Sequence, residues 1–238
     1  MVEVSEIKYC KQTSHLLACD MKGKNKNLRL VLDILLIAFV MLFPHYGHLP
    51  MYAYPFVVLG VIWVYLNFSG ESFSSIGFRF ADLKWRAFYI GGAVGALYAV
   101  FNFYLLGPFI THLGFKHPNL SDFAYLKHNM VSYLLLILLA AVLVIPFEEI
   151  VFRGFILNRL KNIFGDKGSV FSASGIMASI LFALYHWQEG WGAVIAIFIF
   201  ALVITAVYRY FKGNLWYPIF FHIGYDVFML TMIWLGKM

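Results

Sequence analysis

The chain has 238 residues, of which 62% are hydrophobic and 19% aromatic, while only 13% are charged. A soluble domain carries about 25% charged residues, so the composition excludes an ordinary soluble domain and indicates an integral membrane protein whose surroundings are the lipid bilayer. The formal net charge of +6 does not indicate a nucleic-acid partner here, because lysine and arginine collect in the cytoplasmic loops of membrane proteins.

The chain begins with a polar, lysine-rich stretch, and we predict that residues 1–27 form a short cytoplasmic tail. This stretch is too long and too mixed in charge for the n-region of a signal peptide, and no small-residue cleavage site follows it. Its two cysteines, Cys10 and Cys19, have neither a Cys-x-x-Cys pattern nor partner histidines, so we interpret them as reduced thiols. Residues 28–238 are predicted to form a single transmembrane helical domain.

Apolar stretches follow the tail, several of them near or above the roughly 20 residues that a helix needs to cross a bilayer. The predicted fold class is therefore all-α, a polytopic membrane helical bundle of about seven (six to eight) transmembrane helices. Between the second and third spans, residues 76–86 mix aromatic and basic side chains, which indicates an interfacial segment along the cytoplasmic surface. The predicted spans cover about 28–43, 51–68, 87–106, 131–161, 170–186, 191–208 and 216–235.

The distribution of basic residues predicts the orientation. With the N-terminus in the cytoplasm, every lysine and arginine except Lys116, Lys127 and Lys237 lies on the cytoplasmic side or in the fourth span. Such a bias is typical of a multi-pass protein of the cell membrane with this orientation. Within the spans, the small residues from Gly91 to Ala96 predict a close helix–helix approach, and Pro146 predicts a kink in the long fourth helix.

The fourth span carries two adjacent carboxylates and an arginine, Glu148-Glu149-x-x-x-Arg153. An ionised side chain at the middle of a bilayer costs roughly 2.5–3.5 kcal/mol on insertion scales, so repeated charges there indicate a function. Glu149 and Arg153 are four residues apart and are expected to form an ion pair on one helix face. Glu148 points about 100° away and suits general-base chemistry. A salt bridge for helix packing and a carboxylate relay in a transporter are the alternatives.

Two histidine motifs lie on later spans. The stretch from Phe182 to His186 closes the fifth span, and His222 and Asp226 are four residues apart on one face of the seventh. Asp226 could orient the imidazole of His222, or both could face a shared ligand. A lone interface histidine and a polar helix–helix contact are the simpler interpretations of these motifs taken singly.

Together the motifs fit two kinds of hydrolytic site. In one, a glutamate and a histidine activate water while another polar pair stabilises the oxyanion. In the other, Glu148, His186 and His222 are ligands of a divalent metal such as zinc. Both sites require His186 and His222 to meet near the midplane, although they lie near opposite ends of their predicted spans.

In this order and spacing, the motifs resemble the CPBP family of intramembrane proteases, which includes the Rce1-like type II CAAX endopeptidases and the bacterial Abi proteins. The resemblance covers roughly residues 131–235. It implies a helical-bundle endopeptidase whose site lies inside the membrane and whose substrates are membrane-associated peptides or proteins, with lipidated ones included. The family pattern is matched by Glu148-Glu149-x-x-x-Arg153, by Phe182 to His186 and by His222 to Asp226.

The resemblance also implies roles for individual residues. Glu148 and His186 activate the water, and His222 and Asp226 form the side that stabilises the oxyanion. Asp226 stands where the family often has asparagine, so it must be protonated, orient His222 or bind metal if it takes part.

The resemblance further implies that Glu149 and Arg153 support the structure, and it leaves the need for a metal open. The competing hypothesis is a membrane protein without catalytic activity: a scaffold, a bacteriocin-immunity factor or a transport module. In such a protein the same polar residues pack helices or relay charge. Against transport, the first three spans carry nothing comparable to the acids and histidines of the later ones.

Overall fold

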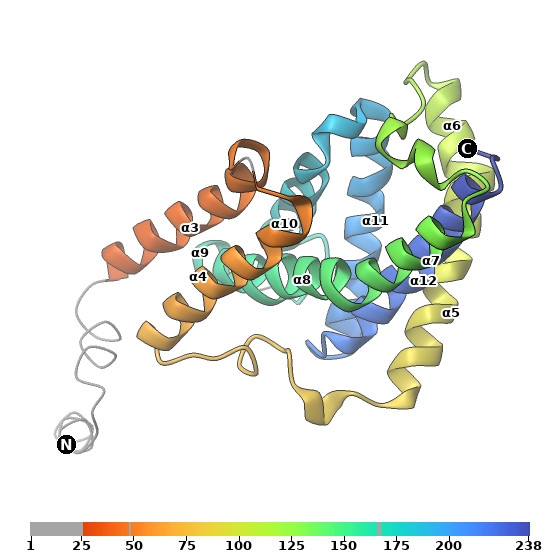
Figure 1. Ribbon diagram of the computed structural model, residues 1–238. Coiled ribbons are helices and arrows are strands. Elements are labelled where there is room, and N and C mark those ends of the chain that lie inside the picture. Colours follow the sequence, from red (N-terminus) through yellow and green to blue (C-terminus); the bar gives the residue numbers. More distant parts are fainter. Residues whose placement is uncertain (1–25, 48, 166–167) are drawn as a thin grey trace, which may run out of the picture. The chain divides into compact units, whose positions relative to one another are not determined.

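The computed structural model describes residues 26–47, 49–165 and 168–238, and every regular element within these ranges is a helix (Figure 1). This confirms the all-α prediction, whereas the proposed cytoplasmic tail lies outside the described residues except at its last two positions. The described chain forms two compact units that divide between Ile76 and Gly77. Each unit is considered by itself, and the single domain expected over 28–238 stays a prediction.

The first unit consists mainly of α3 (Lys26–Tyr46) and α4 (Tyr54–Phe68), the latter preceded by the short 3-10 turn η1 (Met51–Ala53). Two polar pairs connect α3 with α4 and the residues that follow it. Arg29 forms an ion pair with Glu71, and the hydroxyl of Tyr65 donates to Asp33. The first helix continues to Tyr46, one turn beyond its predicted end.

The second unit begins with an irregular segment that contains the single turn η2 (Phe80–Asp82). Its backbone carbonyls bind the start of the last helix, since Trp216 Nε1 donates to Arg79 O at 2.7 Å and Asn214 Nδ2 donates to Asp82 O at 3.2 Å. The third span then runs as one helix through α5 (Trp85–Phe101), the π-helical turn η3 (Asn102–Leu106) and α6 (Gly107–His112). A loop containing the 3-10 helix η4 (Ser121–Leu126) follows.

The fourth span is a continuous helix from Met130 to Phe164, 35 residues long, as the sequence predicted. The π-helical turn η5 ends two residues before Pro146, which lacks the N–H that an α-helix needs at this position. The helix departs from α geometry in two places. Its parts are α7 (Met130–Leu139), η5 (Ala140–Val144), α8 (Ile145–Glu149), η6 (Ile150–Ile156, also π-helical) and α9 (Leu157–Phe164).

The remaining helices are α10 (Ala173–Tyr185), the 3-10 turn η7 (Trp187–Glu189), α11 (Trp191–Tyr210) and α12 (Trp216–Trp234). In the described part of the chain, four helices are long and apolar enough to cross a membrane: 27–46, 85–112, 130–164 and 191–210. Two shorter apolar helices, α4 and α10, accompany them. These helices make the protein a polytopic membrane bundle.

Close backbone contact joins α5 to α12, which lie side by side (Figure 1). A Cβ atom at Gly95 would lie 1.9 Å from Phe221 O, and one at Gly224 would lie 2.3 Å from Gly92 O. Only glycine permits such an approach, so the predicted role of the small residues in helix packing is confirmed. This close contact between α5 and α12, made at Gly95 and Gly224, is called the glycine seam. It packs α12, which carries His222, against the third span.

Candidate functional site

The two carboxylates lie on α8, a segment of five residues between two π-helical turns. A π turn inserts one extra residue into the helix and so rotates the side chains beyond it by about 100° relative to an unbroken α-helix. The direction in which Glu148 and Glu149 point is therefore set by the turns on either side of them. Such π insertions in helices frequently occur at functional sites.

Glu149 and Arg153 form the predicted ion pair, with Arg153 Nη1 3.1 Å from Glu149 Oε1. Both are removed from solvent, at 0% and 2% relative exposure. The guanidinium also lies over the ring of Phe182, its Cζ 4.2 Å from the ring centroid. The pair thus joins the fourth helix to α10 through a cation–π contact.

Glu149 has a second partner that the sequence did not indicate. His222 Nδ1 donates to the same Oε1 atom at 2.8 Å. The carboxylate that was expected only to support the structure therefore also orients the imidazole of His222, the task that Asp226 was considered for. Since Nδ1 carries a proton in this bond, Nε2 is the atom that His222 presents to the rest of the site.

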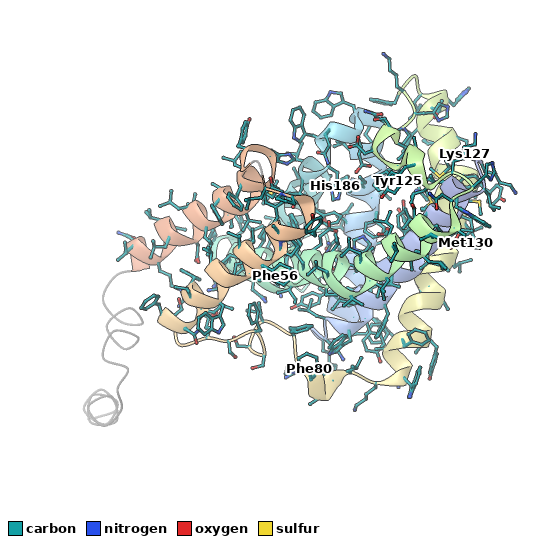
Figure 2. All side chains as sticks on the ribbon, viewed as in Figure 1. Phe56, Phe80, Tyr125, Lys127, Met130 and His186 are labelled. Carbon is teal, nitrogen blue, oxygen red and sulfur yellow. The ribbon has the colours of Figure 1, made fainter. Side chains whose placement is uncertain are left out.

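His186 is oriented in a similar way by a carbonyl group. Its Nδ1 donates to Phe182 O at 3.0 Å, one turn back in α10, and a carbonyl oxygen can only accept. Nε2 of His186 therefore faces Glu148. The residue directly follows the last helical residue of α10, Tyr185 (Figure 2).

The length of α10 explains how the two histidines reach the same depth. With 13 residues, it is about 20 Å long, too short to cross a hydrocarbon core of about 30 Å. Its C-terminal end can therefore lie inside the membrane. The helix α12 begins at Trp216, so His222 lies nearly two turns from its start. The predicted requirement that His186 and His222 converge is met because α10 is short and ends beside the fourth helix.

Glu148 lies between the two imidazoles. Its Oε1 is 3.9 Å from His186 Nε2, and its Oε2 is 3.9 Å from His222 Nε2. The Oδ1 atom of Asp226 is 3.7 Å from the same Nε2 of His222. These separations are too long for direct hydrogen bonds and suit bridging water molecules. The structure thus brings together all four residues that the sequence proposed for catalysis.

The geometry gives no support to the alternative of a metal centre. Donor atoms around a tetrahedral zinc ion lie about 2 Å from it and therefore about 3.3 Å from one another. Within residues 26–47, 49–165 and 168–238, no group of three His, Cys, Asp or Glu side chains is arranged to hold a metal ion. The Glu148 oxygens lie 3.9 Å from Nε2 of His186 and of His222, which is longer than this donor spacing.

One wall of the site comes from α11, which the sequence analysis did not include. The ring centroid of Phe200 lies 5.0 Å from that of His222 and 6.1 Å from that of Phe182. A phenylalanine among the many of an apolar span carries no signal of such a role. Its ring packs against the imidazole of His222 in a T-shaped arrangement.

Glu189 lies near two other acidic side chains, Asp226 and Asp122. Burial raises the pKa of the Glu189 carboxyl to about 7, and the charges of Asp226 and then Asp122 add to this rise. Glu189 follows His186 by three residues, on η7, and its backbone O accepts from Asn119 N at 2.9 Å. The loop before the fourth helix is thereby attached to the turn that follows His186.

Comparison with protein families agrees with these motifs. Residues 130–228, which contain every proposed site residue, match the family described as Type II CAAX prenyl endopeptidase Rce1-like. The resemblance inferred from the motifs is thereby confirmed. No curated protein and no solved structure matches the chain.

Proposed function

Since residues 130–228 match the family described as Type II CAAX prenyl endopeptidase Rce1-like, we propose that the chain is an endopeptidase with its active site inside the membrane. The family indicates a peptidase that acts on membrane-associated proteins. The observation that carries the finer proposal is the position of Glu148, whose two carboxylate oxygens each lie 3.9 Å from the Nε2 atom of a different histidine. We propose that Glu148 and His186 hold and activate the hydrolytic water, while His222 faces the reacting carbonyl group.

In the proposed reaction, a water molecule lies between Glu148 and His186 and donates a hydrogen bond to each. Glu148 takes a proton as the water oxygen attacks the scissile carbonyl carbon, and His186 Nε2 keeps the water in line. The carbonyl oxygen becomes an oxyanion. Glu148 then returns the proton to the leaving amide nitrogen, the carbon–nitrogen bond breaks, and a carboxylic acid and an amine are released.

The oxyanion needs a donor, and His222 is the group best placed to supply it. Because Nδ1 of His222 already donates to Glu149, a second donation has to come from Nε2 of the imidazolium form. Asp226, with Oδ1 3.7 Å from that Nε2, supplies the negative charge that favours this form. An ionised aspartate can therefore serve here without donating a proton itself.

The protein's surroundings are part of the proposal. We place the N-terminus in the cytoplasm and the bundle in the cell membrane, on the bias of basic residues toward one side. The substrate is a peptide or protein at the membrane, and its lipidation is a variable to be tested. Water activation by Glu148 and His186 involves no resident metal ion.

A peptidase assay with matched variants tests the proposal. The protein is reconstituted in lipid vesicles with fluorogenic membrane-anchored peptides, offered in farnesylated and unlipidated forms. Loss of general-base catalysis costs about 10²- to 10⁴-fold, so we expect Glu148→Gln and His186→Ala to lower kcat by at least two orders of magnitude. His112→Ala, an exposed histidine at the end of α6, is the control and should retain full activity. Equal cleavage by all four proteins would refute the proposal.

The same assay separates the remaining alternatives. Addition of a chelator should leave the rate unchanged, and a rate that falls with chelator and returns with zinc would refute activation without metal. A scaffold, immunity or transport protein predicts no cleavage by the wild type. It also predicts that Glu148→Gln changes the cellular phenotype only as far as it changes the amount of protein in the membrane.

A further inference from the structure

A second group of polar side chains lies inside the bundle, where α5 meets α12. Asn102 opens the π-helical turn η3 and is 7% exposed. Its Nδ2 donates to the hydroxyl of Tyr225 at 2.6 Å. Tyr98 lies one turn earlier, with its ring centroid 5.9 Å from that of Tyr225. The three side chains come together at the end of the glycine seam that joins the two helices.

The hydrogen bonds of this group are incomplete. Within the described part of the chain, Asn102 Oδ1 and the hydroxyl of Tyr98 are buried and have no hydrogen-bond partner. Exchanging the oxygen and nitrogen of the Asn102 amide does not help, because the atom that turns away from Tyr225 is then an unpartnered donor. Inside a bilayer each unsatisfied polar group costs several kcal/mol. A partner from outside the chain is therefore expected between these groups.

The free hydrogen-bond donors and acceptors of these three side chains define the kind of partner that fits between them. The hydroxyl of Tyr225 accepts from Asn102 and keeps its own proton to donate, and the hydroxyl of Tyr98 can donate as well. The Asn102 Oδ1 atom can only accept. A single water molecule matches this set, since it accepts from both phenols and donates to the amide oxygen. Three hydrogen bonds are the usual number for a buried water.

The group lies directly beside the proposed catalytic site. Tyr225 precedes Asp226 in α12, and the ring centroid of Phe200 is 4.6 Å from that of Tyr225 and 5.0 Å from that of His222. The same ring is 5.9 Å from that of Tyr98. One aromatic side chain thus contacts both the polar group and the histidine that faces Glu148.

We propose that Tyr98, Asn102 and Tyr225 bind one water molecule inside the membrane-embedded bundle, and that this water replenishes the hydrolytic position beside Glu148. The second clause rests on the proposed peptidase activity, whereas the first does not. Each turnover consumes a water molecule in a site surrounded by lipid-facing helices. The side chain that separates the bound water from the catalytic histidine is Phe200, whose ring contacts both Tyr225 and His222.

An experimental structure tests the binding of water independently of any activity. At about 2 Å resolution, we expect a solvent peak within hydrogen-bond distance of Tyr98 Oη, Asn102 Oδ1 and Tyr225 Oη. The peak should be absent in Tyr98→Phe, which removes only the hydroxyl. Empty space between the three groups in the wild type, or a peak that persists in the variant at the same position, would overturn the site.

Kinetics test the supply of water. We expect Tyr98→Phe and Tyr225→Phe to lower kcat by about 3- to 10-fold, the effect of one hydrogen bond, with KM unchanged because the proposed role is the supply of water and not the binding of substrate. The control is Tyr133→Phe, which removes a tyrosine hydroxyl that bonds Thr231 on α12 at 2.7 Å. An unchanged kcat in the first two variants, or an equal loss in the control, would refute the role. Absence of wild-type cleavage would refute the proposed function and leave the structural test of the water standing.

Discussion

The ion pair of Glu149 and Arg153 gives the sharpest test of how the site is held. Arg153→Met keeps an unbranched, flexible side chain, shortens it by the guanidinium group and removes its charge. The carboxylate of Glu149, at 0% exposure, then retains only His222 as a partner. Removing one member of a buried ion pair typically costs about 3–5 kcal/mol, because the remaining charge is buried without compensation.

This free energy converts into a measurable shift. For domains of about 150–250 residues, 1 kcal/mol lowers Tm by roughly 2–4 °C, so we expect Arg153→Met to lower it by about 6–20 °C. The measurement is thermal unfolding of the purified protein in mild detergent. Part of the loss belongs to the contact with Phe182, over whose ring the guanidinium lies.

A double variant separates loss of charge from loss of packing. Glu149→Gln together with Arg153→Met removes both charges and leaves an amide oxygen that can still accept from His222 Nδ1. Since replacing a whole buried pair is often neutral, the double variant should regain most of the stability lost in Arg153→Met, with a coupling above about 1 kcal/mol. Additive losses, or a Tm of Arg153→Met within 2 °C of the wild type, would refute the reasoning.

Two further predictions concern helix packing and pH. Gly95→Ala should prevent stable folding, seen as loss of a monodisperse peak in size-exclusion chromatography, because its Cβ would lie 1.9 Å from Phe221 O, whereas Gly60→Ala has open space and should fold. Normal behaviour of Gly95→Ala would contradict the close seam. Glu189 has a pKa raised to about 7, so its contribution to stability is present below pH about 4.5 and is lost as pH rises through 7. Glu189→Gln should therefore raise Tm at pH 8 by a few degrees and leave it unchanged at pH 4.5, and an equal shift at both would argue against the raised pKa.

The spans were predictable because each depends on the local run of apolar residues. The ion pair of Glu149 with Arg153 was predictable for the same reason, since a spacing of four fixes it on one helix face. The bond from His222 to Glu149 joins residues 73 positions apart and depends on how two helices pack. A spacing pattern carries no information on that packing, so the orienting role of Glu149 was missed.

The π-helical turns and the end of α10 were unpredictable for a related reason. A π turn is stabilised by the packing around it, and no residue type from Ile150 to Ile156 distinguishes a π-helical turn from an α-helical one. The position of His186 depends on where its helix stops within the membrane. Asn102 did carry a signal, since a lone amide in an apolar span needs a partner, but nothing in the pattern of residues identifies Tyr225 as that partner.

The contacts around Glu149 suggest why an aspartate can replace the family's usual asparagine at position 226. Arg153, Glu149, His222 and Asp226 follow one another through separations of 3.1, 2.8 and 3.7 Å. With His222 in the cationic form required by the proposed mechanism, these groups alternate in charge and sum to zero. An asparagine would donate directly to an oxyanion but would leave the imidazolium with less compensation. Glu148 is the catalytic carboxylate outside this group of four, so no charge within the group balances its own. When Glu148 takes a proton from water, its negative charge is neutralised.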